Sequence, residues 1–356
     1  MLQKFFRKIA YKLSWDLSTN NSQVIEFSAV KLCPVGCKYC PQTLLSEVTN
    51  KNLNSSNLTF ANFKNYLEQI SKENLRIAWT GYSEPLLNRE FPDMVDYAQS
   101  LGIHQEISTT LTGNIKCLDY LSKTEAIEKI TLHLPDNNGL MENGFLQVDD
   151  NYLERLRKIL TILDRKTPPL VKLICFGKDY HPKIKEIINE EKYINKLGNF
   201  KSRQFLGSRS GAIKSFMPGI VTGKIGQYFR KSTRIPLSSI SSLFIKFLSP
   251  KTNIYYCSYQ RLNQPVILGD GKMNICCNDY SLRGIIGDLG KNKLTRIYKN
   301  WYKDNCYNFI YGKLEPCTDC EFYRPIRLDE IFKYYLKEIK SIFKKRYKKY
   351  IFTKKL

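Results

Sequence analysis

The sequence predicts an α/β protein, with a partial (β/α)6 barrel followed by a small α+β C-terminal domain. Segments rich in β-branched residues alternate with segments that carry apolar residues at helical spacing, from residue 24 to about residue 206. Such alternation favours a parallel sheet, because parallel strands are joined by crossover connections that are usually helices. About six strand–helix units are too few to close an eight-stranded barrel. We therefore expect an open, splayed barrel.

The expected strands are short segments that end at a polar residue or a loop. They cover residues 24–31, 75–81, 104–109, 128–134 and 169–176, with a sixth near 202–206. The helices between them are expected where apolar residues recur at intervals of three and four, over residues 59–72, 90–101, 115–123, 151–165 and 181–195. This order places the C-terminal ends of all the strands at one edge of the barrel, where barrel enzymes hold their active sites.

The composition is that of a folded globular protein with many thiols. The chain has 356 residues, of which 42% are hydrophobic, so it can bury one large core or two ordinary ones. Eleven cysteines accompany an N-terminus that lacks the continuous apolar region and cleavage site of a signal peptide. Thiols in a reducing compartment are more often metal ligands than disulfides. We therefore expect a cytoplasmic protein with metal sites.

The net charge of +23 is partly concentrated at the ends of the chain. Residues 324–356 carry twelve Lys/Arg against three Asp/Glu, and Phe332, Leu336, Ile339 and Phe343 lie there at helical spacing. This pattern predicts weak, salt-sensitive contact with an anionic membrane at its inner face. A solvated basic face is the alternative, and we expect no specific nucleic-acid binding.

Three thiols, Cys33, Cys37 and Cys40, lie within the loop that follows the first expected strand. Thiolates are soft ligands that select iron–sulfur clusters, zinc or copper(I). A cubane cluster normally takes four cysteines, so a three-cysteine loop suggests one iron left open for a small molecule. A zinc site with a distant fourth ligand and chance clustering of cysteines are the alternatives.

The Cys-x3-Cys-x2-Cys spacing, with Tyr39 before the last cysteine, resembles the signature of the radical S-adenosylmethionine (radical SAM) superfamily. The second expected strand runs into a Gly-x-x-Glu-Pro segment that resembles this family's Gly-Gly-Glu-Pro segment, with Ser83 where a second glycine is usual. The resemblance implies that SAM chelates the open iron of a 4Fe-4S cluster, near Tyr39. It also implies that SAM is held by residues of the second segment: Gly81, Ser83, Glu84 and Pro85. An ordinary strand-to-helix turn is the alternative for that segment.

Polar residues late in the other strands complete the candidate site. Ser108 and Thr110 end the third strand, where the family commonly places polar residues that face SAM. Parallel strands are usually apolar on both faces, so His133 and Lys172 are candidates for substrate or SAM contact. A structural role with satisfied hydrogen bonds is the alternative. Arg209 lies in a Ser-Arg-x-Gly element that resembles one in related enzymes, and could reach a carboxylate or phosphate.

A second set of thiols follows residue 250. QPVILGDGKMNICC predicts a β-hairpin that turns at residues 269–271, and a short helix near 293–303 precedes a Cys-x2-Cys pair. This region resembles the shortened SPASM/Twitch-like extension that binds one auxiliary cluster in many radical SAM enzymes. The resemblance implies a second 4Fe-4S cluster on Cys257, Cys276, Cys317 and Cys320, and a zinc ribbon is the rival. Cys117, Cys175, Cys277 and Cys306 are expected to be core thiols.

The expected regions are a basic N-terminal helix (1–23), a radical SAM partial barrel (24–215), a linker or substrate-side segment (216–250), the auxiliary cluster domain (251–325) and a basic amphipathic tail (326–356).

The resemblance implies an oxidoreductase that cleaves SAM to a 5′-deoxyadenosyl radical, which abstracts hydrogen from its substrate. We expect a sugar-like or cyclitol alcohol as substrate, and flavodoxin or ferredoxin as the external one-electron donor. Modification of a peptide or protein, such as a crosslink, is the alternative. A basic zinc protein that binds nucleic acid is a more distant one.

Overall fold

The structure is a computed structural model that describes residues 23–52, 57–70, 75–142, 145–177, 179–197, 202–203, 251–258, 264–320, 322–327 and 330. The N-terminal basic helix, Arg209, the linker over 216–250 and the amphipathic tail after residue 330 fall outside the described residues. The expectations about those segments, and the boundaries of the five regions, remain predictions. Within the described residues, no helix has both the length and the apolar character that a membrane crossing requires.

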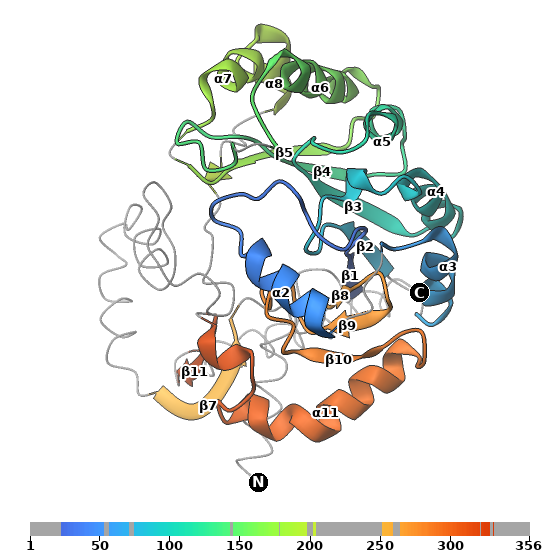
Figure 1. Ribbon diagram of the computed structural model, residues 1–356, viewed down its shortest axis with the longest axis vertical. Coiled ribbons are helices and arrows are strands. Elements are labelled where there is room, and N and C mark those ends of the chain that lie inside the picture. Colours follow the sequence, from blue (N-terminus) through green and yellow to red (C-terminus); the bar gives the residue numbers. More distant parts are fainter. Residues whose placement is uncertain are drawn as a thin grey trace, which may run out of the picture.

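Six parallel strands follow one another across the sheet in chain order, which confirms the partial (β/α)6 barrel (Figure 1). They are β1 (Gln23–Phe27), β2 (Leu75–Trp79), β3 (His104–Thr109), β4 (Lys129–His133), β5 (Leu170–Cys175) and β6 (Ser202–Arg203). The expected strands agree with these positions to within a few residues at each end. All six therefore end at the same edge of the sheet.

Helices cover the outer side of the barrel (Figure 1). They are α3 (Phe60–Glu68), α4 (Phe91–Ser100), α5 (Ile115–Leu121), α6 (Asp150–Leu160), α7 (Pro182–Ile188) and α8 (Glu191–Leu197). Thr59, Asn114 and Asp149 each cap a helix by accepting a hydrogen bond from a backbone N–H of its first turn. The helix expected over 181–195 is instead two helices, because the chain turns at Asn189, a residue that favours helix ends.

The barrel core is built from aromatic side chains of the first strands and helices. Phe27, Phe63 and Trp79 are fully buried, with ring centroids 5.1 to 5.8 Å apart. The indole N–H of Trp79 donates to the side chain of Gln105, which is also buried, at 2.9 Å. A buried amide that is satisfied in this way costs little and fixes the register of β2 against β3.

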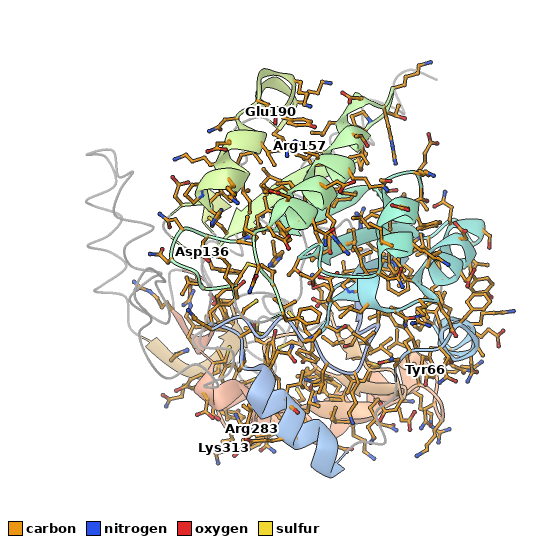
Figure 2. All side chains as sticks on the ribbon, turned by 45° about the horizontal axis from the view of Figure 1, so that its top comes forward. Tyr66, Asp136, Arg157, Glu190, Arg283 and Lys313 are labelled. Carbon is orange, nitrogen blue, oxygen red and sulfur yellow. The ribbon has the colours of Figure 1, made fainter. Side chains whose placement is uncertain are left out.

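The C-terminal hairpin extends the barrel sheet. β8 (Val266–Ile267) pairs in parallel with β1, and β9 (Lys272–Asn274) and β10 (Ile285–Asp288) add antiparallel strands beyond it. The turn at 269–271 is confirmed. Tyr66, which belongs to α3, is labelled in Figure 2. Its hydroxyl donates to the Gly269 carbonyl at 3.3 Å. The expected C-terminal domain is thus partly continuous with the barrel.

The remaining C-terminal elements surround the second set of cysteines. β7 (Lys251–Cys257) and β11 (Tyr323–Arg327) form a separate two-stranded antiparallel sheet. The expected short helix is α11 (Leu294–Ile310), which runs further than residue 303 and packs against this sheet (Figure 1). One helix was not expected: α2 (Gln42–Asn52), which begins directly after the cysteine loop.

Candidate functional site

A cavity of about 310 Å³ lies at the C-terminal ends of the barrel strands. Its lining includes eleven residues that the sequence identified as candidates: Cys33, Cys37, Tyr39, Cys40, Gly81, Ser83, Glu84, Ser108, Thr110, His133 and Lys172. Pro85 lies just behind this wall, buried at the start of a short 3-10 helix (Pro85–Leu87). The structure thus brings together residues from five segments that are far apart in the sequence.

The cysteine loop is folded tightly against the barrel. The Cys40 N–H donates to the Cys37 carbonyl at 2.8 Å, and the Lys38 N–H donates to the Leu140 carbonyl at 2.8 Å. Burial raises the pKa of the Cys33 thiol and raises that of Cys37 to about 12, because a buried thiolate is poorly solvated. Three soft ligands around one cavity fit a cubane, because each thiolate of a cubane binds a different iron.

The Glu84 carboxylate is buried at the cavity wall and accepts four hydrogen bonds. Thr109 Oγ1 and the Leu86 N–H donate to Oε1 at 2.7 and 3.2 Å. The Thr110 N–H and hydroxyl donate to Oε2 at 2.7 and 2.6 Å. Burial raises the pKa of Glu84, and these hydrogen bonds oppose that rise. The carboxylate therefore fixes the end of β2 to the end of β3.

The turn before Glu84 is docked onto the loop that follows β1. Gly81 has φ +53°, and a Cβ there would lie 3.0 Å from the Ser28 Cα, so this position requires glycine. The Ser83 hydroxyl lies 3.3 Å from both the Ser28 hydroxyl and the Val30 N–H. The serine that replaces the usual second glycine therefore provides a side-chain link between the two loops.

Gln42, which is not one of the candidates expected from the sequence, connects the cysteine loop to this turn. Its Nε2 donates to the Tyr82 carbonyl at 2.6 Å, and its Oε1 accepts from the Cys33 N–H at 3.5 Å. Gln42 begins α2, so that helix anchors the end of the cysteine loop. An isolated glutamine after the loop offers no sequence signal for this role.

The sequence analysis also did not identify a layer of charged residues that lies earlier in the strands than the candidate site. Glu26, Glu106 and Lys129 lie at one level of the sheet, through the register β1–β2–β3–β4, and all three line the cavity. Lys129 Nζ pairs with Glu106 at 2.7 Å, whereas no hydrogen bond or ion pair joins Lys172 to another described residue. The available signal was the alternation of polar and apolar residues along each strand.

Aromatic rings form one side of the cavity. The ring of Tyr39 lies 4.4 Å from that of Phe176, between centroids, and His133 lies 5.8 Å from the same Phe176 ring. Tyr39 and Phe176 are both buried. The aromatic residue of the cysteine motif therefore packs against the end of β5 and holds the loop over the strand ends.

The structure also gathers the second set of thiols. Cys257, Cys276, Cys317 and Cys320 are partly buried and pack around the same small hydrophobic cluster, which includes Phe309 and Ile310. Burial raises the pKa of Cys276, and the nearby thiols of Cys277, Cys317 and Cys320 add to the rise. Burial and the neighbouring Cys257 thiol likewise raise the pKa of Cys317. Among the described residues, no group of three or more His, Cys, Asp or Glu side chains is arranged to hold a single metal ion. The four thiols are the ligand type that both a cluster and a zinc ribbon use, and the structure gathers them without a formed tetrahedral zinc site.

The expectation for the other four cysteines holds for two of them. Cys117 and Cys175 are buried in the barrel core. Cys306 lies partly buried beside the second thiol set, and Cys277 lines the barrel cavity. Cys276 and Cys277 are neighbours in the chain but pack against different hydrophobic clusters.

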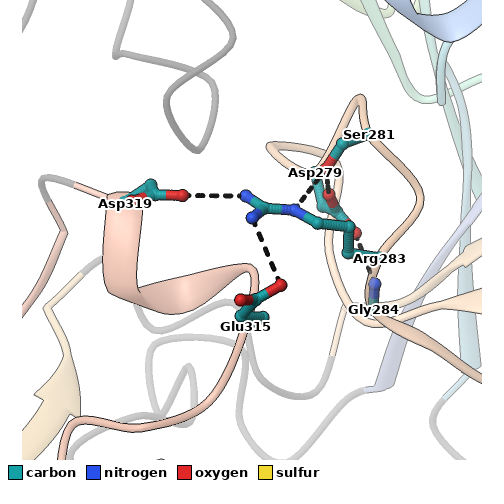
Figure 3. A network of polar contacts seen from close by, with 6 residues as sticks. All are labelled: Asp279, Ser281, Arg283, Gly284, Glu315 and Asp319. Atoms are coloured by element: carbon teal, nitrogen blue, oxygen red, sulfur yellow. Dashed lines mark hydrogen bonds and ion pairs between the residues drawn. The ribbon is translucent and has the colours of Figure 1, made fainter.

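A polar network fastens the loop of Cys276 to the turn of Cys317 and Cys320 (Figure 3). The Arg283 guanidinium contacts Glu315 at 3.4 Å, Asp319 at 3.0 Å and Ser281 Oγ at 2.9 Å. Asp279 in turn accepts hydrogen bonds from Ser281 Oγ at 2.6 Å and the Gly284 N–H at 2.7 Å. The two loops, which carry three of the four thiols of the second set, are therefore held together by charge-assisted contacts.

No family model matches this chain. A PqqA peptide cyclase of Xanthomonas oryzae pv. oryzae is 25% identical over 105 residues, and one of Xanthomonas campestris pv. campestris matches equally. The match covers 29% of this chain and 27% of the Xanthomonas oryzae protein, so little more than a quarter of that relative is spanned.

Solved structures with a similar arrangement include BtrN in complex with AdoMet and 2-DOIA (16% identity, TM-score 0.44, covering 84% of this chain and 92% of that one). Another is Streptococcus suis SuiB bound to the precursor peptide SuiA (14% identity, TM-score 0.48, covering 89% and 73%). A third is anSMEcpe with bound AdoMet (13% identity, TM-score 0.49, covering 84% and 86%).

Proposed function

We propose that this chain, a relative of the radical SAM enzymes, binds a 4Fe-4S cluster through Cys33, Cys37 and Cys40 and uses SAM to abstract a hydrogen atom from its substrate. The supporting observation is that these thiols share one cavity with the Gly81–Glu84 turn and the ends of β3, β4 and β5. The bound cluster would supply the electron that cleaves SAM to methionine and a 5′-deoxyadenosyl radical.

The residues of the chain would bind and orient SAM. The negative charge of Glu84 would attract the ammonium group of SAM, and that ammonium would in turn favour the ionised carboxylate that burial disfavours. Ser108 and Thr110 offer hydroxyls at the same wall. The buried pair of Tyr39 and Phe176 would exclude water from one side of the cavity.

We favour oxidation of a sugar-like or cyclitol alcohol as the reaction. Glu26, Thr131 and Lys172 make the inner part of the cavity polar, which supports a substrate that carries hydroxyl or charged groups. His133 and Lys172 are the described residues proposed to contact that substrate. Oxidation removes one further electron after hydrogen abstraction, and a second 4Fe-4S cluster on Cys257, Cys276, Cys317 and Cys320 is the proposed acceptor. A flavodoxin or ferredoxin would supply the first electron.

Modification of a peptide is the second candidate, because the sequence match is to PqqA peptide cyclases. Both candidates share SAM cleavage and hydrogen abstraction, and they differ in the fate of the substrate radical. Mass spectrometry of reactions with cyclitols and with candidate precursor peptides separates them. Oxidation of the alcohol lowers its mass by two hydrogens, whereas peptide modification changes the mass or the fragmentation of the peptide.

Anaerobic reconstitution with iron and sulfide tests the enzyme class. The protein should hold about eight irons as two cubanes, and replacing Cys33, Cys37 and Cys40 by Ala should leave about four. The same variant should produce no 5′-deoxyadenosine, while replacement of the core thiol Cys117 by Ala serves as the control. Production of 5′-deoxyadenosine by the triple variant would show that the SAM site lies elsewhere.

A further inference from the structure

Tyr280 belongs to the loop of the second thiol set but lies at the barrel cavity. It follows Cys276 by four residues in the loop between β9 and β10. Its side chain lines the cavity that holds Cys33, Cys37 and Cys40. Its hydroxyl lies 3.8 Å from Cys40 Sγ, within the range of a hydrogen bond that involves sulfur. Tyr280 therefore connects the loop of the second thiol set directly to the first thiol set.

The position of Tyr280 is fixed by a buried network around Tyr82. The two rings meet edge to face at 4.9 Å. The Tyr82 hydroxyl lies 2.8 Å from the Cys276 carbonyl and accepts from Asn274 Nδ2 at 2.6 Å. Asn274 also donates to the Asp279 carbonyl, at 2.9 Å. Because Tyr82 and Asn274 are buried, this loop cannot move without losing several satisfied hydrogen bonds.

We propose that Tyr280 donates a hydrogen bond to the Cys40 thiolate in the cluster-bound protein and thereby raises the reduction potential of the SAM-binding cluster. Once Cys40 binds iron it is a thiolate, so the tyrosine hydroxyl is the group of this pair that can donate. A donor to a cluster ligand stabilises the more negative, reduced state. The inference rests on the proposed function, because it requires a cluster on the first thiol set.

The test is the variant Tyr280→Phe, which keeps the ring against Tyr82 and removes only the hydroxyl. We expect a more negative midpoint potential for the SAM-binding cluster, measured by redox titration with EPR detection. The EPR signal that changes on addition of SAM identifies that cluster. Tyr66→Phe is the matched control, because its hydroxyl also contacts the C-terminal hairpin, at Gly269, but is not among the residues lining the cavity. The midpoint potential of the SAM-binding cluster in Tyr66→Phe should equal that in the wild type.

A second variant keeps the test decisive if Tyr280→Phe binds no iron. Tyr82→Phe retains the hydroxyl of Tyr280 but releases the loop that positions it, so its potential should shift in the same direction. An unchanged midpoint potential in an iron-loaded Tyr280→Phe protein would overturn the proposal. If only Tyr82→Phe binds iron, an unchanged midpoint potential in that variant would overturn it. Failure of the wild-type protein to hold a SAM-responsive cluster would instead refute the proposed function.

Discussion

Thr110 donates two hydrogen bonds to a single oxygen of Glu84, from its N–H at 2.7 Å and from its hydroxyl at 2.6 Å. The other Glu84 oxygen faces the Leu86 N–H at 3.2 Å. Each carboxylate oxygen therefore meets a backbone donor that cannot rotate away or become an acceptor. The positions of Glu84 Oε1 and Oε2 must therefore both be occupied by hydrogen-bond acceptors. A carboxylate provides two acceptors, whereas an amide provides one acceptor and one donor.

Glu84→Gln should lower both stability and SAM affinity. In either orientation the amide NH2 faces a backbone N–H, and an unsatisfied buried donor costs about 1–3 kcal/mol. Loss of a charge-assisted contact to the SAM ammonium, typically about 1.5–3 kcal/mol, should weaken SAM binding roughly ten-fold or more. Denaturant unfolding and calorimetric titration with SAM measure the two effects. Unchanged SAM affinity in the folded variant would leave Glu84 with a purely structural role.

The pH dependence of stability provides a separate test of Glu84. Burial raises its pKa in the folded state above the ordinary value of 4.5, so the folded protein binds a proton more tightly than the unfolded chain does. The contribution of Glu84 to stability is then fully present below the unfolded pKa and is lost as the pH rises through the folded pKa. The stability difference between the wild type and Glu84→Gln should therefore shrink as the pH rises above about 4.5 in SAM-free protein. A difference that does not vary with pH would mean that the four hydrogen bonds cancel the effect of burial.

Local sequence patterns were sufficient to predict the barrel, and the resemblance to the radical SAM family supplied most of the cavity residues. The strand positions and the cysteine loop depend on short-range periodicity and spacing, and the residues named from them and from the resemblance converge on one cavity. Tyr82, Gln42 and Tyr280 were missed because their roles depend on contacts with residues distant in the chain. The pairing of β8 with β1 was missed for the same reason, since about 240 residues separate Glu26 from Val266.

Two lysines that line the cavity lead to a prediction about the substrate. Lys172 makes no ion pair with another described residue, whereas Lys129 is paired with Glu106 at 2.7 Å. Lys172→Met should therefore raise the KM for the substrate while 5′-deoxyadenosine still forms without substrate. Lys129→Met should instead lower stability, because it leaves the Glu106 carboxylate without its partner. Equal KM values for Lys172→Met and the wild type would exclude Lys172 from substrate binding.

The second thiol set can be tested through the fate of the substrate radical. Abstraction of hydrogen from a carbon that bears a hydroxyl leaves a radical, which must lose one electron and one proton to become a carbonyl. Cys317→Ala should remove the proposed electron acceptor while leaving the barrel cavity intact, because Cys317 is not among the residues that line it. The variant should still transfer deuterium from labelled substrate to 5′-deoxyadenosine, but it should form no oxidised product.

Cys306→Ala is the matched control for that experiment, because Cys306 lies beside the same hydrophobic cluster but is not one of the proposed ligands. It should retain the full iron content and form product at the wild-type rate. Iron analysis of Cys317→Ala shows whether the second cluster alone has been lost, with about four irons remaining. If Cys317→Ala lacks that cluster and still forms product at the normal rate, the second thiol set has a structural role. The electron from the substrate would then need a different acceptor, and oxidation of an alcohol through this site would no longer be tenable.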